Sequence, residues 1–208
     1  MIAFSDLHSS THFLERLKEK FGKKGNEIFL FTGDLIDFTR SKDEIFSILE
    51  DLSKNNKVFA IPGNCDRSFV DKKLEELGIN VDKKRKEIKG KELNVVGFGG
   101  SLKTPFSTPN ERKEEDFYSI FELVDSKTIL LSHIPPFGIF DEVKNEHIGS
   151  KVLREIIKKK NPYMLVCGHV HETSGVKKIK NTTVVKLPPA KFGFLARINN
   201  KVEFENIF

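Results

Sequence analysis

The chain has 208 residues, of which 38% are hydrophobic and 31% charged, a balance typical of a globular protein and unlike that of a disordered or fibrous one. Its 35 basic and 30 acidic residues leave a formal charge of +5. Lysine-rich solvated helices leave an excess this small, so charge alone does not indicate a nucleic-acid-binding protein. We expect a single domain over residues 1–208.

The sequence carries no signal for membrane insertion or export. The longest apolar stretch, residues 128–140, is interrupted by a histidine and two prolines. Asp6 lies in the first candidate active-site loop, which leaves no room for a cleaved signal peptide. The two cysteines, Cys65 and Cys167, suit a reducing compartment. These features predict a cytoplasmic protein.

Short apolar runs alternate with amphipathic stretches, which predicts an α/β layered domain. The runs expected to form buried strands are residues 2–4, 28–31, 58–61, 129–131 and 164–166. After the first of them, apolar residues from Phe13 to Phe21 repeat at helical spacing, and Gly22 is suited to end that helix.

Three further helices are predicted from their boundary residues. Capping boxes at Ser41 to Glu44 and Thr108 to Glu111 predict helices over residues 42–54 and 109–124. A last helix is expected over residues 150–160, where an Asn-Pro pair ends it.

The remaining segments are a long loop and a strand-rich end. Residues 97–110 contain three glycines and two prolines and predict an irregular loop, either a functional lid or a plain surface connection. Beyond Glu172, strand-like segments separated by turn residues predict a β meander. These segments are residues 176–179, 182–187, 192–198 and 202–204.

Metal-capable side chains follow directly after each predicted strand of the α/β region. They are Asp6, His8, Asp34, Asn64, His133, His169 and His171. Open α/β sheets bind ligands at the carboxyl ends of their strands, so these side chains are expected to converge. An isolated Asp-x-His or Gly-Asp turn is more often an ordinary turn. Four of the six histidines fall in this set, however, which makes coincidence a poor explanation.

The ordered set D-x-H, G-D, G-N-C-D, S-H and G-H-x-H, spread over residues 6–171, resembles the calcineurin-like metallophosphoesterase superfamily. Residues 132–138, 147–150 and 168–172 resemble its small prokaryotic branch of Icc-related phosphoesterases. The resemblance implies a four-layer α/β/β/α sandwich, in which two mixed sheets are flanked by helices and the late β segments belong to the second sheet.

The resemblance also implies two metal ions and their ligands. One ion is held by Asp6, His8 and His171, the other by Asn64, His133 and His169, and Asp34 bridges them. Imidazoles, carboxylates and an amide oxygen suit divalent Mn, Fe, Co, Ni or Zn, of which we favour Mn. Absence of paired thiolates disfavours a structural zinc site.

Two adjacent divalent ions can activate a bridging water and neutralise charge on phosphoryl oxygens, so no side-chain nucleophile is required. The expected activity is hydrolysis of small phosphate esters, phosphodiesters foremost. Asp34, Asn64 and His133 are predicted to be catalytic through the metal ions, together with Asp66. Asp66 and Asp37 follow ligand-bearing turns and are candidates to orient histidines, with Asp66 favoured; solvent-facing turn residues are the alternative.

Two residues stay open in function. Most of the superfamily has a histidine at Cys65, which contacts the scissile phosphate and assists the leaving group, whereas the small prokaryotic branch commonly has cysteine. Cys65 is therefore either a small buried hydrophobe or a weak contact to metal or substrate. Cys167 is expected in the core. His147 is either a surface residue or a substrate-binding one.

Two other functions are alternatives to a small-molecule hydrolase. A non-catalytic interaction module could retain the fold, although such modules lose ligands and this set is complete except at Cys65. A nuclease of the same superfamily would act on nucleic acid, a partner that we do not favour because no basic arm or aromatic-rich basic strip is evident.

Overall fold

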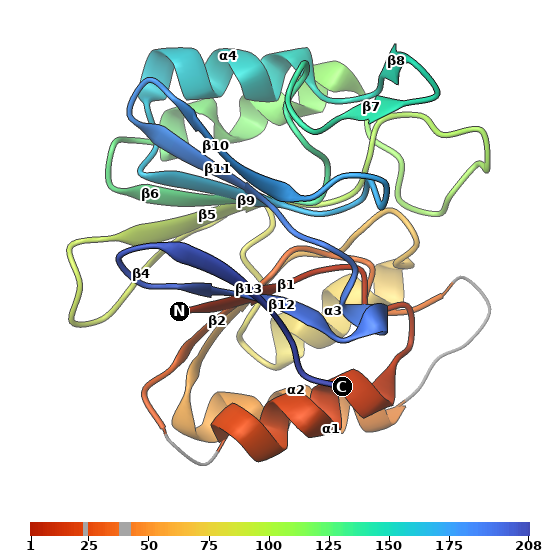
Figure 1. Cartoon of the computed structure of the whole chain (residues 1–208), viewed down its shortest axis with the longest axis vertical. Coiled ribbons are helices and arrows are strands. Elements are labelled where there is room, and N and C mark those ends of the chain that lie inside the picture. Colours follow the sequence, from red (N-terminus) through yellow and green to blue (C-terminus); the bar gives the residue numbers. More distant parts are fainter. Residues whose placement is uncertain (23–24, 38–42) are drawn as a thin grey trace.

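The computed structural model describes residues 1–22, 25–37 and 43–208. Within these ranges the chain forms two large β-sheets packed face to face, with helices on both outer faces (Figure 1). This is the four-layer α/β/β/α arrangement, and the predicted fold class is confirmed.

The first sheet has five strands in the described chain, in the order β13-β12-β1-β2-β3. Strands β1 (Ile2–Phe4), β2 (Ile28–Phe31) and β3 (Lys57–Ala60) are parallel. Strands β12 (Phe194–Ile198) and β13 (Val202–Asn206) add to its edge as an antiparallel hairpin. The first two strands have their predicted bounds, and β3 is shifted one residue toward the N-terminus.

The second sheet has the order β10-β11-β9-β6-β5-β4 among the described residues. Its strands are β4 (Arg85–Glu87), β5 (Asn94–Phe98), β6 (Thr128–Ser132), β9 (Met164–Cys167), β10 (Gly175–Ile179) and β11 (Thr182–Lys186). The inner four are parallel, and β4 and β10 close the edges in antiparallel pairing. Strands β4 and β5 have no counterpart among the predicted strands, because one is short and polar and the other runs into glycines.

Helices cover the outer face of each sheet. The first sheet is covered by α1 (Thr11–Leu17), α2 (Asp43–Asn55) and α3 (Ser68–Glu76), and the second by α4 (Lys151–Lys160) and the 3₁₀ helix η2 (Glu114–Leu123) (Figure 1). Side chains alternate across each strand, so Ala3 and Leu30 pack between the sheets while Phe4 and Phe31 pack under the helices. The result is one apolar core at each of the three layer boundaries.

Three predicted helices are confirmed in the described residues. The first continues beyond Leu17 as a π-helical turn, Lys18–Gly22, and stops at the predicted glycine. The second begins at Asp43, and its predicted cap, Ser41, lies outside the described residues. In the last, Ser150 Oγ accepts the Leu153 N–H at 2.9 Å, and the chain leaves the helix through a left-handed Asn161.

The predicted helix over residues 109–124 is wrong. Only Glu114–Leu123 is helical, and it is a 3₁₀ helix. Glu111 does accept the Thr108 N–H at 2.9 Å, as in a capping box, but no helix follows because Asn110 bonds instead to a neighbouring loop. The local pattern is present, and tertiary contacts redirect the chain.

The predicted C-terminal meander is also wrong, as is the placement of all late strands in the second sheet. Strands β10 and β11 form a hairpin in the second sheet, whereas β12 and β13 form a hairpin in the first. The crossover contains Pro188-Pro189 and a short 3₁₀ turn, Ala190–Phe192. Proline has no N–H to donate, so β11 does not continue through this segment. Pro189 instead makes an isolated bridge with Ser5, beside β1 of the first sheet.

Candidate metal centre

The predicted metal-capable side chains converge where the parallel strands end. Asp6 and His8 follow β1, Asp34 follows β2, and Asn64 follows β3 in the first sheet. From the second sheet, His133 follows β6, and His169 and His171 follow β9. The carboxyl ends of both sheets thus meet at one edge of the sandwich.

The first group consists of Asp6, His8 and His171. One potential ligand atom from each lies within 4.8 Å of the others. Asp6 is fully buried, and its Oδ1 lies 3.3 Å from Nε2 of His171. The rings of His8 and His171 meet edge to face at 5.4 Å, so both imidazoles point toward the same small volume.

The second group is built around His133. Its Nε2 lies 2.8 Å from Oδ1 of Asn64 and 3.4 Å from Oδ1 of Asp34. The His169 ring lies 5.0 Å away, centroid to centroid. Asp34 also reaches the first group, since its other oxygen lies 3.7 Å from Nε2 of His8. One carboxylate therefore lies between the two groups.

An unpaired buried nitrogen shows that the residues fit a metal ion. His8 donates from Nδ1 to Asp37 at 3.1 Å, while its buried Nε2 has no hydrogen-bond partner in the described structure. An imidazole held through Nδ1 with Nε2 free toward carboxylates is the usual state of a metal-binding histidine. This chemistry suits a divalent ion of the Mn to Zn series.

The electrostatics also favour bound cations. Burial by itself would raise the pKa of Asp6, but its hydrogen bond to His171 and the charge of His133 hold that pKa well below the ordinary range. In Asp34, burial is likewise outweighed by His133, and the pKa falls to about 2. Burial and the neighbouring His133 lower the pKa of His169 to about 3. Although burial lowers it, the charge of Asp34 raises the pKa of His133 to about 9, so a protonated His133 balances these carboxylates here. A bound cation would supply that positive charge in its place.

Backbone strain is concentrated in the same turns. Asp6, His8, Asp34 and His169 have φ values of 57°, 44°, 55° and 71°, in the left-handed region that L-residues seldom occupy. Such strain persists where the surrounding structure holds it and is typical of functional sites. The turns therefore orient their side chains at the cost of an unfavourable backbone conformation.

Close approach of the turns depends on glycine. A Cβ at Gly63 would collide with the carboxylate and backbone of Asp34, and one at Gly168 would collide with Ser5 and Asp6. Each glycine lets a ligand-bearing turn approach a carboxylate of a different strand. The G-N and G-H motifs of the sequence thus have a steric cause.

Asp66 and Asp37 support the site in different ways. The buried Asp66 accepts backbone N–H bonds from Leu35, Ile36 and Gly63 at 3.0, 3.0 and 2.7 Å, and so joins the Asp34 turn to the Asn64 turn. Burial and the negative charge of Asp34 raise its pKa to about 6. Of these two carboxylates it is Asp37 that contacts a histidine, although Asp66 was the favoured candidate for that role.

Cys65 is buried and also faces the site. Its side chain is 8% exposed, and its Sγ shares a volume 4.8 Å across with ligand atoms of His8 and Asp34. Burial, reinforced by Asp34, raises the pKa of the thiol. Cys167 lies in the core under α4, as predicted.

His147 lies apart from the seven converging residues. It belongs to a hairpin formed by β7 (Glu142–Val143) and β8 (Glu146–His147). Its Nδ1 lies 2.8 Å from the buried carboxylate of Asp141, and its ring packs on Phe137 at 5.1 Å. The described contacts join it to none of the metal-capable side chains, and a substrate-binding role stays a prediction.

One buried cation had no signal in the sequence. Lys186, at the end of β11, is fully buried and donates from Nζ to the Leu187 carbonyl at 2.9 Å. Burial lowers its pKa, and its charge helps to lower the pKa of Asp6. A lysine at the end of an apolar strand is normally expected at the surface. The burial of Lys186 could therefore be found only from the structure.

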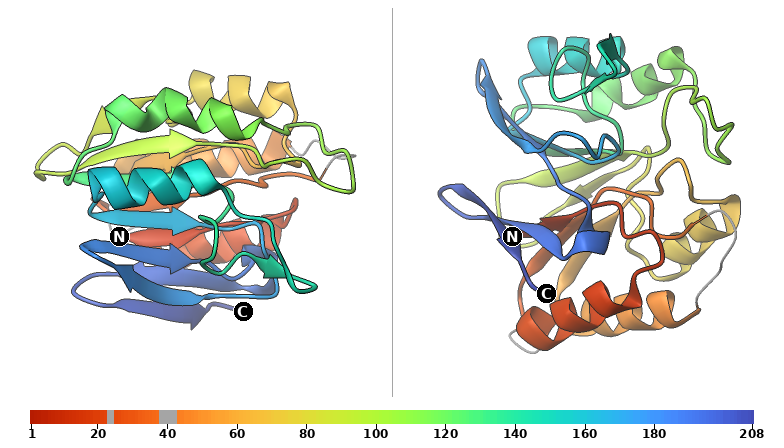
Figure 2. Two further views of the ribbon diagram at one scale, coloured as in Figure 1. Left: turned by 90° about the horizontal axis from the view of Figure 1, so that it is seen from above. Right: turned by 45° about the vertical axis from the view of Figure 1, so that its right-hand side comes forward.

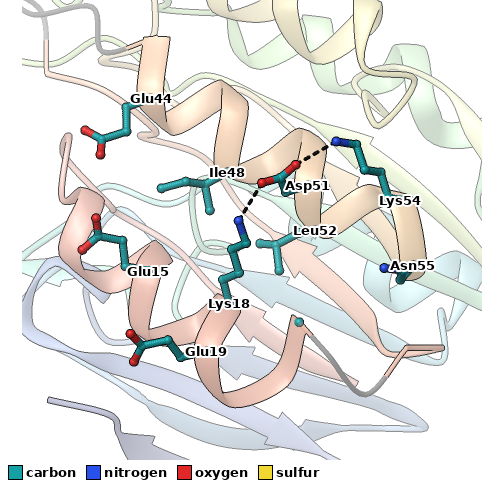
Figure 3. Close-up of a pocket in the computed structure, with 10 residues that line it drawn as sticks. Glu15, Lys18, Glu19, Glu44, Ile48, Asp51, Leu52, Lys54 and Asn55 are labelled. Carbon is teal, nitrogen blue, oxygen red and sulfur yellow. Dashed lines mark hydrogen bonds and ion pairs between the residues drawn. The ribbon is translucent and has the colours of Figure 1, made fainter.

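A hollow lies away from the candidate metal centre. It has a volume of about 760 Å³ and runs between α1 and α2 (Figure 3). Asp51 pairs there with Lys18 at 2.6 Å and with Lys54 at 2.8 Å. None of the seven converging residues lines it, and its charged groups are those of a solvated groove between helices.

The family model of calcineurin-like phosphoesterases matches residues 1–173. The chain belongs to this family. Calcineurin-like phosphoesterases depend on a dinuclear metal site, and the two groups of donors described above are its candidate ligands here. The resemblance predicted from the motifs is thereby confirmed.

The chain is similar to a curated protein in sequence and to solved structures in fold. A protein of Methanocaldococcus jannaschii named uncharacterized protein MJ1162 is 36% identical over 201 residues, which cover 92% of this chain and 89% of its own. Among solved structures, TT1561 of Thermus thermophilus has a TM-score of 0.76 at 19% identity, with 100% of this chain and 98% of that chain covered. A dimetal phosphatase of Danio rerio has a TM-score of 0.69 at 10% identity, with 100% and 96% covered. At these identities the structures show the shared fold.

No helix in the described ranges combines the length and the apolar character that crossing a membrane requires.

Proposed function

We propose that this calcineurin-like phosphoesterase uses two divalent metal ions to hydrolyse small phosphate esters, phosphodiesters foremost. The position of Asp34 carries the proposal. Its Oδ1 lies 3.4 Å from Nε2 of His133, and its Oδ2 lies 3.7 Å from Nε2 of His8. A carboxylate with one oxygen toward each group of donors is suited to bridge two ions.

The remaining ligands divide between the two ions. Asp6, His8 and His171 hold one ion, and Asn64, His133 and His169 hold the other. When bound, two such ions acidify a water molecule and neutralise charge on the phosphoryl oxygens. This combination of imidazole, carboxylate and amide donors suits divalent ions of the Mn to Zn series, and among these we favour Mn²⁺.

The protein fixes the ligands before any ion binds. His133 donates from Nδ1 to the Thr32 carbonyl at 2.7 Å, which leaves Nε2 directed at Asp34 and Asn64. Asp37 holds His8 in the same manner. Asp66 contributes by holding the two turns together, and its role in catalysis is that of a positioning residue.

Among the described residues of the site, no side chain is suited to act as a nucleophile. Cys65 is the one thiol within the site's described residues, and burial together with Asp34 keeps it protonated. Hydrolysis then depends on activated water and on the acidity of the leaving group, because a thiol is a weak proton donor. This favours aryl or otherwise activated diesters.

A non-catalytic interaction module would not require the features found here. The strained turns and the unpaired Nε2 of His8 each destabilise a protein that does not bind metal. They support the hydrolase over the module. The two cysteines are free, which is consistent with the cytoplasm as the proposed location.

Metal analysis combined with turnover tests the proposal. Protein stripped with chelator and then loaded with Mn²⁺ is expected to bind two ions per chain and to hydrolyse bis(4-nitrophenyl) phosphate faster than 4-nitrophenyl phosphate. A faster rate on the monoester would identify a phosphatase instead. Protein that binds two ions but turns over neither ester would favour the module.

A further inference from the structure

A buried lysine lies beside the candidate metal centre. Lys186 is the last residue of β11, and its side chain is fully buried. We propose that the Lys186 ammonium is a fixed positive charge that lowers the affinity of the first group of donors for its metal ion. This inference rests on the metal ions of the proposed function and adds a residue that sets how tightly they are held.

The end of β11 is bonded to the ligand-bearing turn that follows β9. Lys186 is paired in register with Cys167, and the Leu187 N–H donates to the Cys167 carbonyl at 2.8 Å. The next residue of that turn is Gly168, where a Cβ would collide with the Asp6 carboxylate. The backbone of this turn thus brings the end of β11 close to Asp6.

The chain that leaves β11 also holds the turn of Asp6. It crosses from the second sheet to the first, where it meets the end of β1 (Figure 2). There the Ala190 N–H donates to the Ser5 carbonyl at 2.8 Å, and the Lys191 N–H donates to the Asp6 carbonyl at 3.2 Å. Backbone bonds on both sides of Lys186 therefore fix its position relative to Asp6.

Lys186 and Asp6 act on each other through charge. In the described ranges Nζ of Lys186 donates to one acceptor, the uncharged Leu187 carbonyl at 2.9 Å. Burial lowers the pKa of Lys186, and the charge of Asp6 opposes that shift. Burial acts to raise the pKa of Asp6, whereas its bond to His171 lowers it and the charge of Lys186 adds to that lowering. Because both side chains are buried, water and salt screen this interaction only weakly.

The charge of Lys186 opposes a metal ion in the first group of donors. Histidine ligands bind metal in their neutral form and therefore do not repel it. Lys186 donates to a carbonyl and is not one of the proposed ligands, so its charge remains when an ion binds. Two positive charges repel each other more strongly in a buried region than at the surface. The first ion should therefore be held less tightly than its ligands alone would hold it.

Neutral substitutions of Lys186 test this charge. Mn²⁺ is titrated by calorimetry into chelator-stripped protein at low and at high salt. Lys186→Met keeps the apolar stem without the charge, and it should bind one of the two ions at least about tenfold more tightly than wild type. The gain should persist at high salt, because a buried charge is screened little. Lys186→Gln is also neutral but keeps an N–H donor, and it should show the same gain, whereas Lys186→Arg should retain the wild-type affinity.

Lys178→Met is the matched control, because Lys178 is exposed on the neighbouring strand β10. It should leave both Mn²⁺ affinities unchanged. Equal affinities in wild type and in both neutral variants of Lys186 would overturn the inference. Weaker binding in those variants would overturn it as well, since Lys186 would then support the shape of the turn. Failure of the proposed function looks different: wild type would bind no Mn²⁺, and the inference about Lys186 would fall with it.

Discussion

The backbone N–H of Cys65 donates a hydrogen bond to Oδ1 of Asp34 at 2.8 Å. This contact joins the turn after β3 to the turn after β2, and Asp66 joins the same two turns from behind. Asp34 is thereby oriented before any metal binds, with its oxygens directed at His133 and His8. Preorganisation of the bridging ligand makes it the most informative residue to change.

Asp34→Asn should keep the fold and lose the metal site. The amide oxygen can still accept from Cys65, but the negative charge between the two groups is gone. We expect metal analysis to find fewer than two ions per chain. The rate of hydrolysis should fall by about 10³-fold or more, where each tenfold corresponds to ~1.4 kcal/mol of barrier.

The control for this variant is Asp51→Asn, which removes a carboxylate from the surface of α2. It should keep full metal content and full rate. Asp34→Asn with unchanged metal content and turnover would contradict the bridging assignment.

Chelation should abolish activity, and the ions should differ in restoring it. Mn²⁺, Co²⁺ and Ni²⁺ are expected to restore hydrolysis better than Mg²⁺, because the histidine ligands suit them and Mg²⁺ prefers oxygen. Calcium should fail. Rates after dialysis against each ion decide this, and a metal-free protein that turns over at the full rate would remove the metal mechanism.

Asp66→Ala should destabilise the protein strongly. It leaves the buried N–H groups of Leu35, Ile36 and Gly63 without their acceptor. Each unpaired buried donor costs about 1–3 kcal/mol, so the free energy of unfolding in urea should fall by roughly 3 kcal/mol or more.

Asp37→Ala is the comparison, because Asp37 is half exposed and its carboxylate accepts a hydrogen bond from Nδ1 of His8. It should change the free energy of unfolding by about 1 kcal/mol or less and weaken metal binding instead. Equal loss of stability in both variants would refute the distinct roles given to these carboxylates.

The convergence of the seven candidate donors was predictable from the sequence because each follows an apolar strand, and parallel strands of one sheet end at one edge. The hydrogen-bond partners that hold these side chains and their turns could not be predicted. Asp66 bonds to residues 30 and 31 positions earlier in the chain, and Asp37 to a histidine 29 positions away. Such contacts depend on how turns of different strands are arranged in space, which local patterns do not encode.

The same limit explains the errors in the fold. Thr108 and Glu111 do interact as a capping box predicts, yet Asn110 is drawn to the carbonyl of Asn64. In the strand-rich end, hairpin signals correctly predicted strands but not their sheets, because β11 pairs with β9 and β12 with β1. Pairing between distant strands is set by the packing of both sheets.

Glu111→Ala should loosen the loop that follows β5. The variant removes the acceptor of four hydrogen bonds from Thr104 and Thr108. Amide hydrogen exchange of these residues should become at least about tenfold faster, while exchange in β5 stays unchanged. Glu111→Gln keeps an acceptor oxygen, so its exchange rates should lie between those of wild type and Glu111→Ala. Identical exchange in all three proteins would show that the hydrogen bonds to Glu111 do not hold the loop.

Cys65 should make the enzyme sensitive to the leaving group. A histidine at this position would donate a proton or a charged hydrogen bond, whereas the thiol is a weak donor, and burial raises its pKa further. Rates on a series of aryl diesters should therefore fall steeply as the pKa of the leaving phenol rises. A flat dependence while chemistry is rate-limiting would contradict this account.

Two substitutions at Cys65 separate its roles. Cys65→Ser should keep metal content and aryl-ester turnover within about tenfold, or ~1.4 kcal/mol of barrier, because no proposed ligand is lost. Cys65→His, where it folds, should gain most on esters with poor alkyl leaving groups. The thiol shares a volume 4.8 Å across with ligand atoms of His8 and Asp34, so a different result is informative. If Cys65→Ser loses metal and activity together, the sulfur itself is a ligand, and a description of the site by nitrogen and oxygen donors alone would be wrong.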